Sequence, residues 1–144
     1  MILGIGLGKI ELVLDKTYFN FGEVIKGKLK LTLKENVEAR GLRVRLIEER
    51  TIKAFNLSRG TSETRKEEIM LNEVNLAGEQ SFSSQDYDFE LAIPSSPNNT
   101  QITNTLSQAA NFFGAKPPIR YLIDASLDIP NKFDVNKKIV IVIK

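Results

Sequence analysis

Apolar and polar residues alternate along most of this chain, most regularly between Lys9 and Leu33. Two extended segments there flank an aromatic turn that ends at Gly22 and Glu23. In the second segment, apolar residues on one face oppose mostly lysines on the other. Alternation with a period of two is typical of a β-strand that has one face on a core and the other in water. The sequence therefore predicts two half-buried strands in this region.

The same period predicts strands through the rest of the chain. We expect them at residues 42–55, 67–75, 84–93, 119–127 and 138–143, the first of these crossing a bulge near residue 48. The segments between the strands are polar and rich in turn-forming residues, which favours connections there. Residues 34–39 are one such connection, and the longer loop 56–66, around Gly60, is another.

One segment departs from this period. Between Thr100 and Phe113, apolar residues recur at spacings of three and four, and Gly114 follows as a stop signal. This pattern predicts one short amphipathic helix near residues 100–113. Seven or eight strands with a late helix predict an all-β fold, an immunoglobulin-like antiparallel β-sandwich. A chain of 144 residues fits a single domain, residues 1–144.

Composition removes several classes of function. The chain has no histidine and no cysteine, so it can form neither a Ser-His-Asp nor a Cys-His catalytic system, nor a zinc site ligated by these residues. The adjacent acids Glu48-Glu49 and Glu67-Glu68 point to opposite faces of a strand, which argues against the paired carboxylates of a glycoside hydrolase. We therefore expect no enzyme, no catalytic residue, no metal site and no cofactor.

Charge and hydropathy narrow the partners and the location. A formal net charge of +2 is too small to indicate a nucleic-acid partner. No segment approaches the roughly 20 apolar residues of a membrane helix, and the apolar start of the chain is a poor signal peptide. Together with the absence of cysteine, this favours a protein of the reducing cytoplasm, without membrane insertion, whose partners are other proteins.

Two charged rows are expected to lie on neighbouring strands. Lys26, Lys28 and Lys30 form a basic row, and Asp86, Asp88 and Glu90 form an acidic row. Cross-strand ion pairing is the plainest interpretation. A groove for phosphate or an acidic peptide is the alternative for the lysines, and a calcium site is a weak one for the acids. Arg43 and Arg45 are expected to pair in the same way with Asp124 or Asp128.

Three segments are candidates for contact with partners. Gly4, Gly6 and Gly8 alternate with apolar residues, which predicts a flat, weakly registered strand edge that invites pairing with another chain, a homodimer included. The loop 56–66 carries the cations that we take as partner-binding residues, Arg59, Arg65 and Lys66. The segment 100–113 either plugs the open end of the sandwich or offers an apolar face to a partner or a lipid surface, although it has no cation to attract a membrane. A terminus packed on its own chain and a loop that meets only solvent remain the plainer alternatives.

Four stretches give the chain a family resemblance. They read LVLDKTYFNFGEVIKGKLKLTL, GLRVRLIEE, YDFELAIPSSP and PPIRYLIDASLDIPNKFDVNKKIVIVI. Their order and motifs resemble the amino-terminal domain of the arrestin clan, and the closing turn is similar to that of its bacterial sporulation-control proteins. The resemblance implies an adaptor or scaffold that grips other proteins by sheet edges and loops. It does not carry over phosphoreceptor sensing, because the first strand lacks paired lysines and no acidic loop of a second domain is present to meet Arg120.

The sequence thus favours a non-enzymatic protein-interaction module that binds through sheet edges and end loops. Two alternatives come from other classes of protein. One is a structural subunit of a surface or filamentous assembly built by strand exchange, and the other is a small-ligand-binding β-sandwich.

Overall fold

The computed structural model describes residues 7–56, 59–97, 118–130 and 134–144. The elements of these residues are strands: β1 (Gly8–Leu14), β2 (Tyr18–Phe19), β3 (Val24–Leu33), β4 (Val37–Ala39), β5 (Gly41–Asn56), β6 (Thr61–Ala77), β7 (Gln80–Phe82), β8 (Gln85–Ala92), β9 (Ile119–Asp128) and β10 (Val135–Ile143). The fold is all-β, as the alternating pattern predicts. The helix predicted near residues 100–113 lies outside the described residues.

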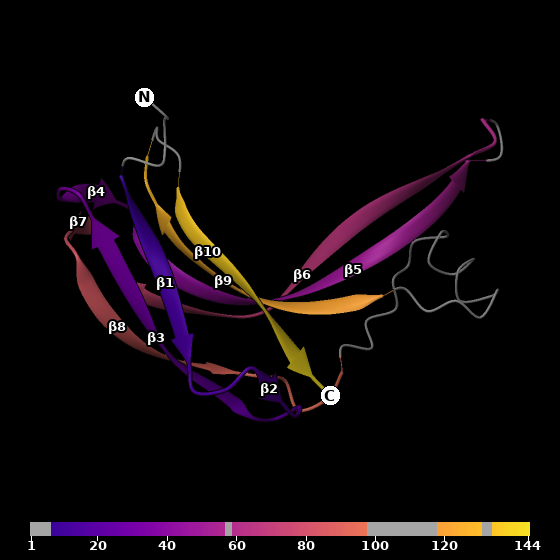
Figure 1. Cartoon of the computed structure of the whole chain (residues 1–144), viewed down its shortest axis with the longest axis horizontal. Coiled ribbons are helices and arrows are strands. Elements are labelled where there is room, and N and C mark those ends of the chain that lie inside the picture. The colour runs from indigo at the N-terminus through magenta and orange to yellow at the C-terminus, as the bar shows by residue number, and fades with distance from the viewer. Residues whose placement is uncertain (1–6, 57–58, 98–117, 131–133) are drawn as a thin grey trace.

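The strands form two main sheets (Figure 1). One has the order β1-β3-β8 and is antiparallel, and the other has the order β2-β10-β9-β5-β6. A small ribbon of β4 and β7 lies at one end. The outer halves of β5 and β6 extend as a long hairpin away from the two-layered part, so the molecule has the outline of a crescent (Figure 1).

The core lies between the two sheets and follows the alternation of the sequence. In β3, the residues that face the core are buried and those between them are mostly exposed. The largest fully buried core side chains include Phe19, Phe82, Ile25, Leu29, Leu31, Leu42, Leu46, Leu91, Ile123 and Leu127. One-sided burial of this kind explains why the strand period could be read directly from the sequence.

The first strand changes sheets. β1 pairs with β3 in the three-stranded sheet, whereas β2 pairs in parallel with the end of β10 in the five-stranded sheet. The N–H of Val142 donates to the carbonyl of Thr17 (2.9 Å), and the N–H of Lys144 donates to the carbonyl of Phe19 (3.0 Å). The chain therefore crosses from one layer to the other between residues 14 and 18 and ties both sheets together there.

On the opposite side of the sandwich, β6 and β8 lie together. The side-chain amide of Asn72 on β6 donates to the carbonyl of Ala92 on β8 (2.9 Å). This bond uses a carbonyl at the outer edge of β8, because the neighbouring Ile93 N–H bonds to Glu23 beside β3 and the groups of Ala92 therefore point away from β3. It joins the two sheets at this side, opposite the change of sheet.

Two boundaries differ from the expectations. Residues 61–66 belong to β6 and pair with 51–56 of β5, so the expected loop 56–66 is a hairpin end with Gly60 at a positive φ of 63°. The sequence does not predict this part of β6 because all of residues 61–66 are polar and exposed, so no alternation of apolar and polar residues marks a strand there. Part of the expected connection 34–39 is the short strand β4. The bulge near residue 48 is confirmed, because the β5–β6 register shifts between Leu46 and Ile47.

Replacing Gly27 by Ala tests the closeness of packing in the three-stranded sheet. A Cβ at Gly27 would lie 2.7 Å from Cδ2 of Leu14 and 2.7 Å from Cζ of Phe89. We expect the Gly27→Ala variant to lose about 1–3 kcal/mol of unfolding free energy, measured by urea denaturation, because the core must shift to admit the methyl group. Gly78→Ala is the matched control, since a Cβ there meets nothing within 4 Å. Equal stability of both variants would contradict this packing.

Candidate functional site

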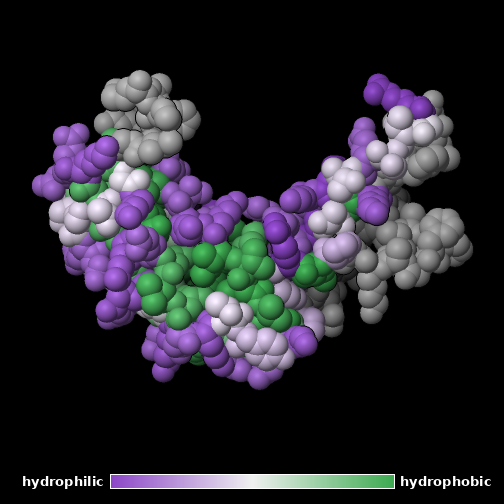
Figure 2. Space-filling model, in the orientation of Figure 1, coloured by the Kyte–Doolittle hydropathy of each residue, from purple (hydrophilic) through white to green (hydrophobic). Residues whose placement is uncertain are grey.

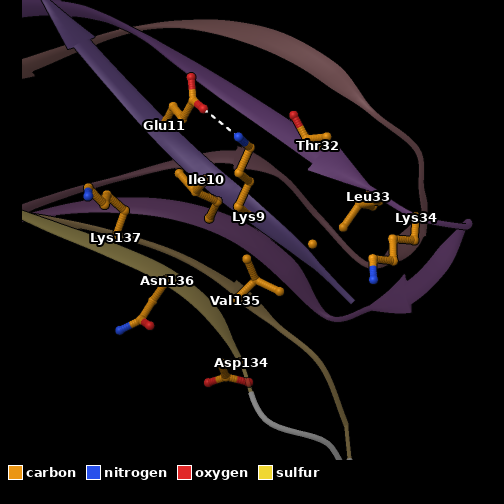
Figure 3. Close-up of a pocket in the computed structure, with 11 residues that line it drawn as sticks. Lys9, Ile10, Glu11, Thr32, Leu33, Lys34, Asp134, Val135, Asn136 and Lys137 are labelled. Atoms are coloured by element: carbon orange, nitrogen blue, oxygen red, sulfur yellow. Dashed lines mark ion pairs between the residues drawn. The ribbon is translucent and has the colours of Figure 1, made fainter. Parts of the chain in front are cut away.

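The edge strands β1 and β10 border an open seam between the two sheets. Both strands start at the same end of the molecule and run in the same direction (Figure 1). The chain that follows β1 reaches β10 as the short strand β2, and β1 and β10 lie nearer each other at their first residues than at their last (Figure 1). Figure 3 shows Lys9 to Glu11 on one strand and Asp134 to Lys137 on the other, with open space between them. The cleft here has a volume of about 680 Å³.

The hydrogen bonds of β1 show which of its backbone groups face the seam. The N–H of Lys34 donates to the carbonyl of Leu7, and the N–H of Asp15 donates to that of Lys26. These bonds place the odd-numbered residues of β1 in hydrogen-bonded pairs with β3, because such pairs alternate along an antiparallel ladder. The N–H and C=O groups of Gly8, Ile10, Leu12 and Leu14 therefore point away from β3, at the free edge.

The same reasoning applies to β10. The N–H of Thr51 donates to the carbonyl of Pro118 (3.0 Å), so even-numbered residues of β9 bond to β5 and odd-numbered ones bond to β10. In β10, the odd-numbered residues consequently bond to β9. The backbone groups of Asn136, Lys138 and Val140 point to the other side, upstream of the short β2 pairing at residues 142 and 143.

The rim of the seam is charged, and lysines predominate. Lys9 forms an ion pair with Glu11 (2.9 Å), and the hydrogen bond from Lys9 lowers the pKa of the exposed Glu11 carboxyl. The positive charges of Lys30 and Lys137 act in the same direction. Asp134 accepts a hydrogen bond from the N–H of Ile129 (3.1 Å), which fixes the turn before β10. A carboxylate of a partner would thus meet several cations at this rim.

Apolar side chains lie behind this rim. Ile10 is buried, while Leu12, Leu14 and Ile139 are half-buried and pack against the core. Figure 2 shows apolar surface gathered in the middle of this face of the molecule. A strand that entered the seam would find unpaired backbone groups beside an apolar surface, which are the two requirements for strand addition.

The predicted binding residues Arg59, Arg65 and Lys66 lie elsewhere, toward the end of the β5–β6 hairpin (Figure 1). All three are exposed. Arg65 approaches Glu67 at 3.8 Å and Lys66 approaches Glu49 at 3.9 Å. The structure therefore separates this cationic hairpin end from the seam. Sequence reasoning missed the seam's β10 side because Val135 and Asn136 extend that strand upstream of its predicted start at Lys138.

The two charged rows face each other as expected. Lys26 lies opposite Glu90, Lys28 opposite Asp88, and Lys30 opposite Asp86. A shallow cleft of about 320 Å³ lies among Lys26, Asp88 and Glu90. The register is thus confirmed, but among these described residues no lysine comes within 4 Å of the opposite carboxylate. The rows form a charged, solvated face.

Arg45 and Asp124 form the expected pair at 2.5 Å, and Asp124 is buried. Arg43 instead donates to the hydroxyl of Ser126 (3.4 Å). Nε of Arg45 and Oδ1 of Asp124 lack a protein hydrogen-bond partner. These polar groups lie on the outer face of β5 and β9, where they link the two central strands.

Glu48 and Glu49 both accept hydrogen bonds from arginine side chains. Glu48 accepts from Nε of Arg50 (2.7 Å) and from the hydroxyl of Tyr121 (3.4 Å). Burial, together with the charge of Glu48, raises the pKa of Tyr121. Glu49 points to the other face, as expected, and accepts two hydrogen bonds from Arg120 (2.7 and 3.1 Å). Both glutamates are buried and anchor the base of the β5–β6 hairpin to β9.

The described residues also bear on metal binding and membrane insertion. Within the described ranges, no group of three or more His, Cys, Asp or Glu side chains is placed to hold a metal ion. The same residues include no helix with the length and apolarity needed to cross a membrane.

Replacing Glu48 by Ala tests its structural role. Arg50 would lose a carboxylate partner at a site where it is only 6% exposed, and we expect a loss of about 3 kcal/mol of unfolding free energy in urea denaturation. Glu68→Ala removes a carboxylate from an exposed pair and should change stability by less than about 0.5 kcal/mol. A Glu48→Ala variant as stable as Glu68→Ala would show that the buried pair contributes nothing to the hairpin base.

Comparison with known proteins places this geometry in a family. A search of curated protein sequences gave no match. Among solved structures, Spo0M, a sporulation control protein from Bacillus subtilis, superimposes with a TM-score of 0.67 at 14% sequence identity. The alignment covers 96% of this chain and 50% of Spo0M, so the chain spans about half the length of that protein. At this identity the likeness shows a shared fold.

The family match is independent of that superposition. Residues 6–143 match the model of the arrestin (or S-antigen) C-terminal domain. The motifs quoted above resemble the amino-terminal domain of the same clan, so the predicted family is confirmed while the matched domain is the C-terminal one. The match extends over nearly the whole chain, and the chain therefore belongs to the arrestin family.

Proposed function

We propose that this chain is a non-enzymatic adaptor or scaffold module that binds other proteins through its sheet edges and its hairpin end. The observation that carries the proposal is the seam. Two edge strands there have unpaired backbone groups, an apolar surface behind them and a lysine-rich rim. Extended segments of partner proteins bind such edges by adding a strand, with the backbone supplying affinity and the side chains supplying specificity.

The composition supports a cytoplasmic setting for this function. A chain without cysteine needs no oxidising compartment to fold. Two of the four acids weighed for catalysis, Glu48 and Glu49, are engaged with arginines at the hairpin base. The surface presents unpaired backbone N–H and C=O groups and charged side chains, both of which suit contact with another protein.

Blocking the free edge of β10 tests the seam. Asn136 is exposed and its N–H points away from β9, so Asn136→Pro removes a donor from the free edge and leaves the β9 ladder intact. We expect proteins captured from the native host by the tagged chain to be lost from this variant. Glu35→Pro, in the exposed bend before β4, is the matched control and should retain them. If Asn136→Pro keeps every partner while circular dichroism shows a native fold, the β10 edge is not the binding edge.

Reversing charge tests the hairpin end. In the triple variant Arg59→Glu, Arg65→Glu, Lys66→Glu, we expect at least about a tenfold weaker capture of acidic partners, because three cations become anions. Lys26→Glu, Lys28→Glu and Arg40→Glu together reverse as many charges at exposed positions that line neither the hairpin end nor the seam, and should leave that capture unchanged. Retention of every partner by the hairpin variant would remove Arg59, Arg65 and Lys66 from the binding surface.

A further inference from the structure

The free edge of β1 is complementary to itself in one register, and we propose that it pairs with the β1 strand of a second copy of this chain. This inference rests on the proposed function, because it names the strand that occupies one edge of the seam. It follows from three features of β1: which backbone groups are unpaired, which charges lie between them, and where the edge is open.

Backbone geometry limits the registers. The unpaired N–H and C=O groups of β1 belong to its even-numbered residues, as shown above. In a symmetric antiparallel pair, even-numbered residues of one copy must therefore lie opposite even-numbered residues of the other. A slip by one residue would pair free groups with groups already bonded to β3, so only registers two residues apart remain.

Charge selects among these registers. When Ile10 lies opposite the partner's Ile10, Lys9 lies opposite the partner's Glu11, and Glu11 lies opposite the partner's Lys9. Both side chains are exposed on the outer face, at 66% and 51% of their full surface. Two cross-strand pairs of opposite charge form at once, each of a kind that stabilises an antiparallel pair.

Side-chain size agrees with the same register. On the face toward the core, Gly8 lies opposite the partner's Leu12, so the smallest residue meets a large one. Just before the strand, the half-buried Leu7 lies opposite the partner's Val13, and Val13 is 52% exposed in the single chain. The pairing would therefore cover apolar surface at both ends and place opposite charges in the middle.

The neighbouring registers lack this agreement. With the centre shifted toward the start of the strand, Lys9 faces the partner's Lys9. With the centre shifted the other way, Glu11 faces the partner's Glu11. Like charges directly opposite each other destabilise an antiparallel pair, so the register centred on Ile10 is favoured from both sides.

The position of the open cleft also fits. The cleft lies beside Gly8 to Glu11, between β1 and the start of β10 (Figure 3). The centre of the proposed pair, Ile10, is in this stretch. Joining two copies there would merge two three-stranded sheets into one continuous sheet of six strands.

The experiment is a charge exchange within the full chain. Sedimentation equilibrium should show a reversible species of twice the 16.2 kDa chain mass for the native sequence. Lys9→Glu alone and Glu11→Lys alone each create two like-charge pairs across the interface, so each should raise the dimer dissociation constant by about tenfold or more. The double variant Lys9→Glu, Glu11→Lys restores opposite charges and should return the constant to within about threefold of the native value.

Controls separate pairing from folding. Lys53→Glu and Glu38→Lys make the same charge changes at exposed positions away from β1 and should leave the dimer unchanged. Thermal unfolding followed by circular dichroism should show native-like transitions for all variants, since the Lys9–Glu11 pair within one chain is exposed. The double variant also restores the internal Lys9–Glu11 pair, so the deciding arm is an equal mixture of the two single variants, in which each internal pair stays broken but the charges across the interface are opposite. Pairing between copies predicts a heterodimer in that mixture, and an effect confined to one chain predicts none.

Three results would overturn the inference. They are a monomer at all concentrations, a dimer indifferent to Lys9→Glu and Glu11→Lys, and a double variant that fails to recover. A monomeric chain that still loses its host partners on Asn136→Pro would refute pairing between copies while the proposed function stands. Conversely, a dimer that follows the charge exchange but captures no host protein would support self-pairing and count against the adaptor.

Discussion

The rest of the structure depends on the crossing of the first strand from one sheet to the other. Two backbone hydrogen bonds, from Val142 to Thr17 and from Lys144 to Phe19, hold β2 against the end of β10. Because β1 remains with β3, β1 and β10 run along the borders of the two layers and lie farther apart toward their last residues, where the chain crosses (Figure 1). The seam between them is the geometric result: the chain crosses it near the last residues of both strands, and the cleft lies beside their first residues. Its edges are free because each strand lies at the border of a different layer.

A second constraint holds the long β5–β6 hairpin to this body. Beyond the sandwich, β5 has β9 on one side and β6 on the other, with less core to bury. Glu48 and Glu49 use the two faces of β5 at this point, one bonding to Arg50 and Tyr121 and the other to Arg120. Buried charges are costly unless they are paired and hydrogen-bonded, so these contacts fix how the hairpin leaves the body rather than add much stability.

Most of the fold could be predicted from the sequence because one face of each core strand is buried. Ile25, Leu29 and Leu31 alternate with exposed lysines, and the buried face is readable wherever such a core exists. The prediction failed at Thr61 to Lys66, where both faces of the strand are exposed and only pairing with β5 makes it a strand. For the site, the sequence predicted a free edge at Gly4, Gly6 and Gly8, of which Gly4 and Gly6 lie outside the described residues, and it missed β10. No local pattern shows which edge of a strand is unpaired, since that depends on the order of strands in the sheet.

Free strand edges are hazards for a folded protein, and the seam shows how charge limits the hazard. A row of unpaired backbone groups accepts any extended segment unless side chains oppose it. Lys9, Glu11 and Lys138 stand along these edges, so a segment with the wrong charges opposite them is rejected at little cost to the fold. A segment with matching charges meets both the backbone and the apolar surface behind it. The charges that prevent indiscriminate pairing are therefore the same ones that define the register of a correct partner.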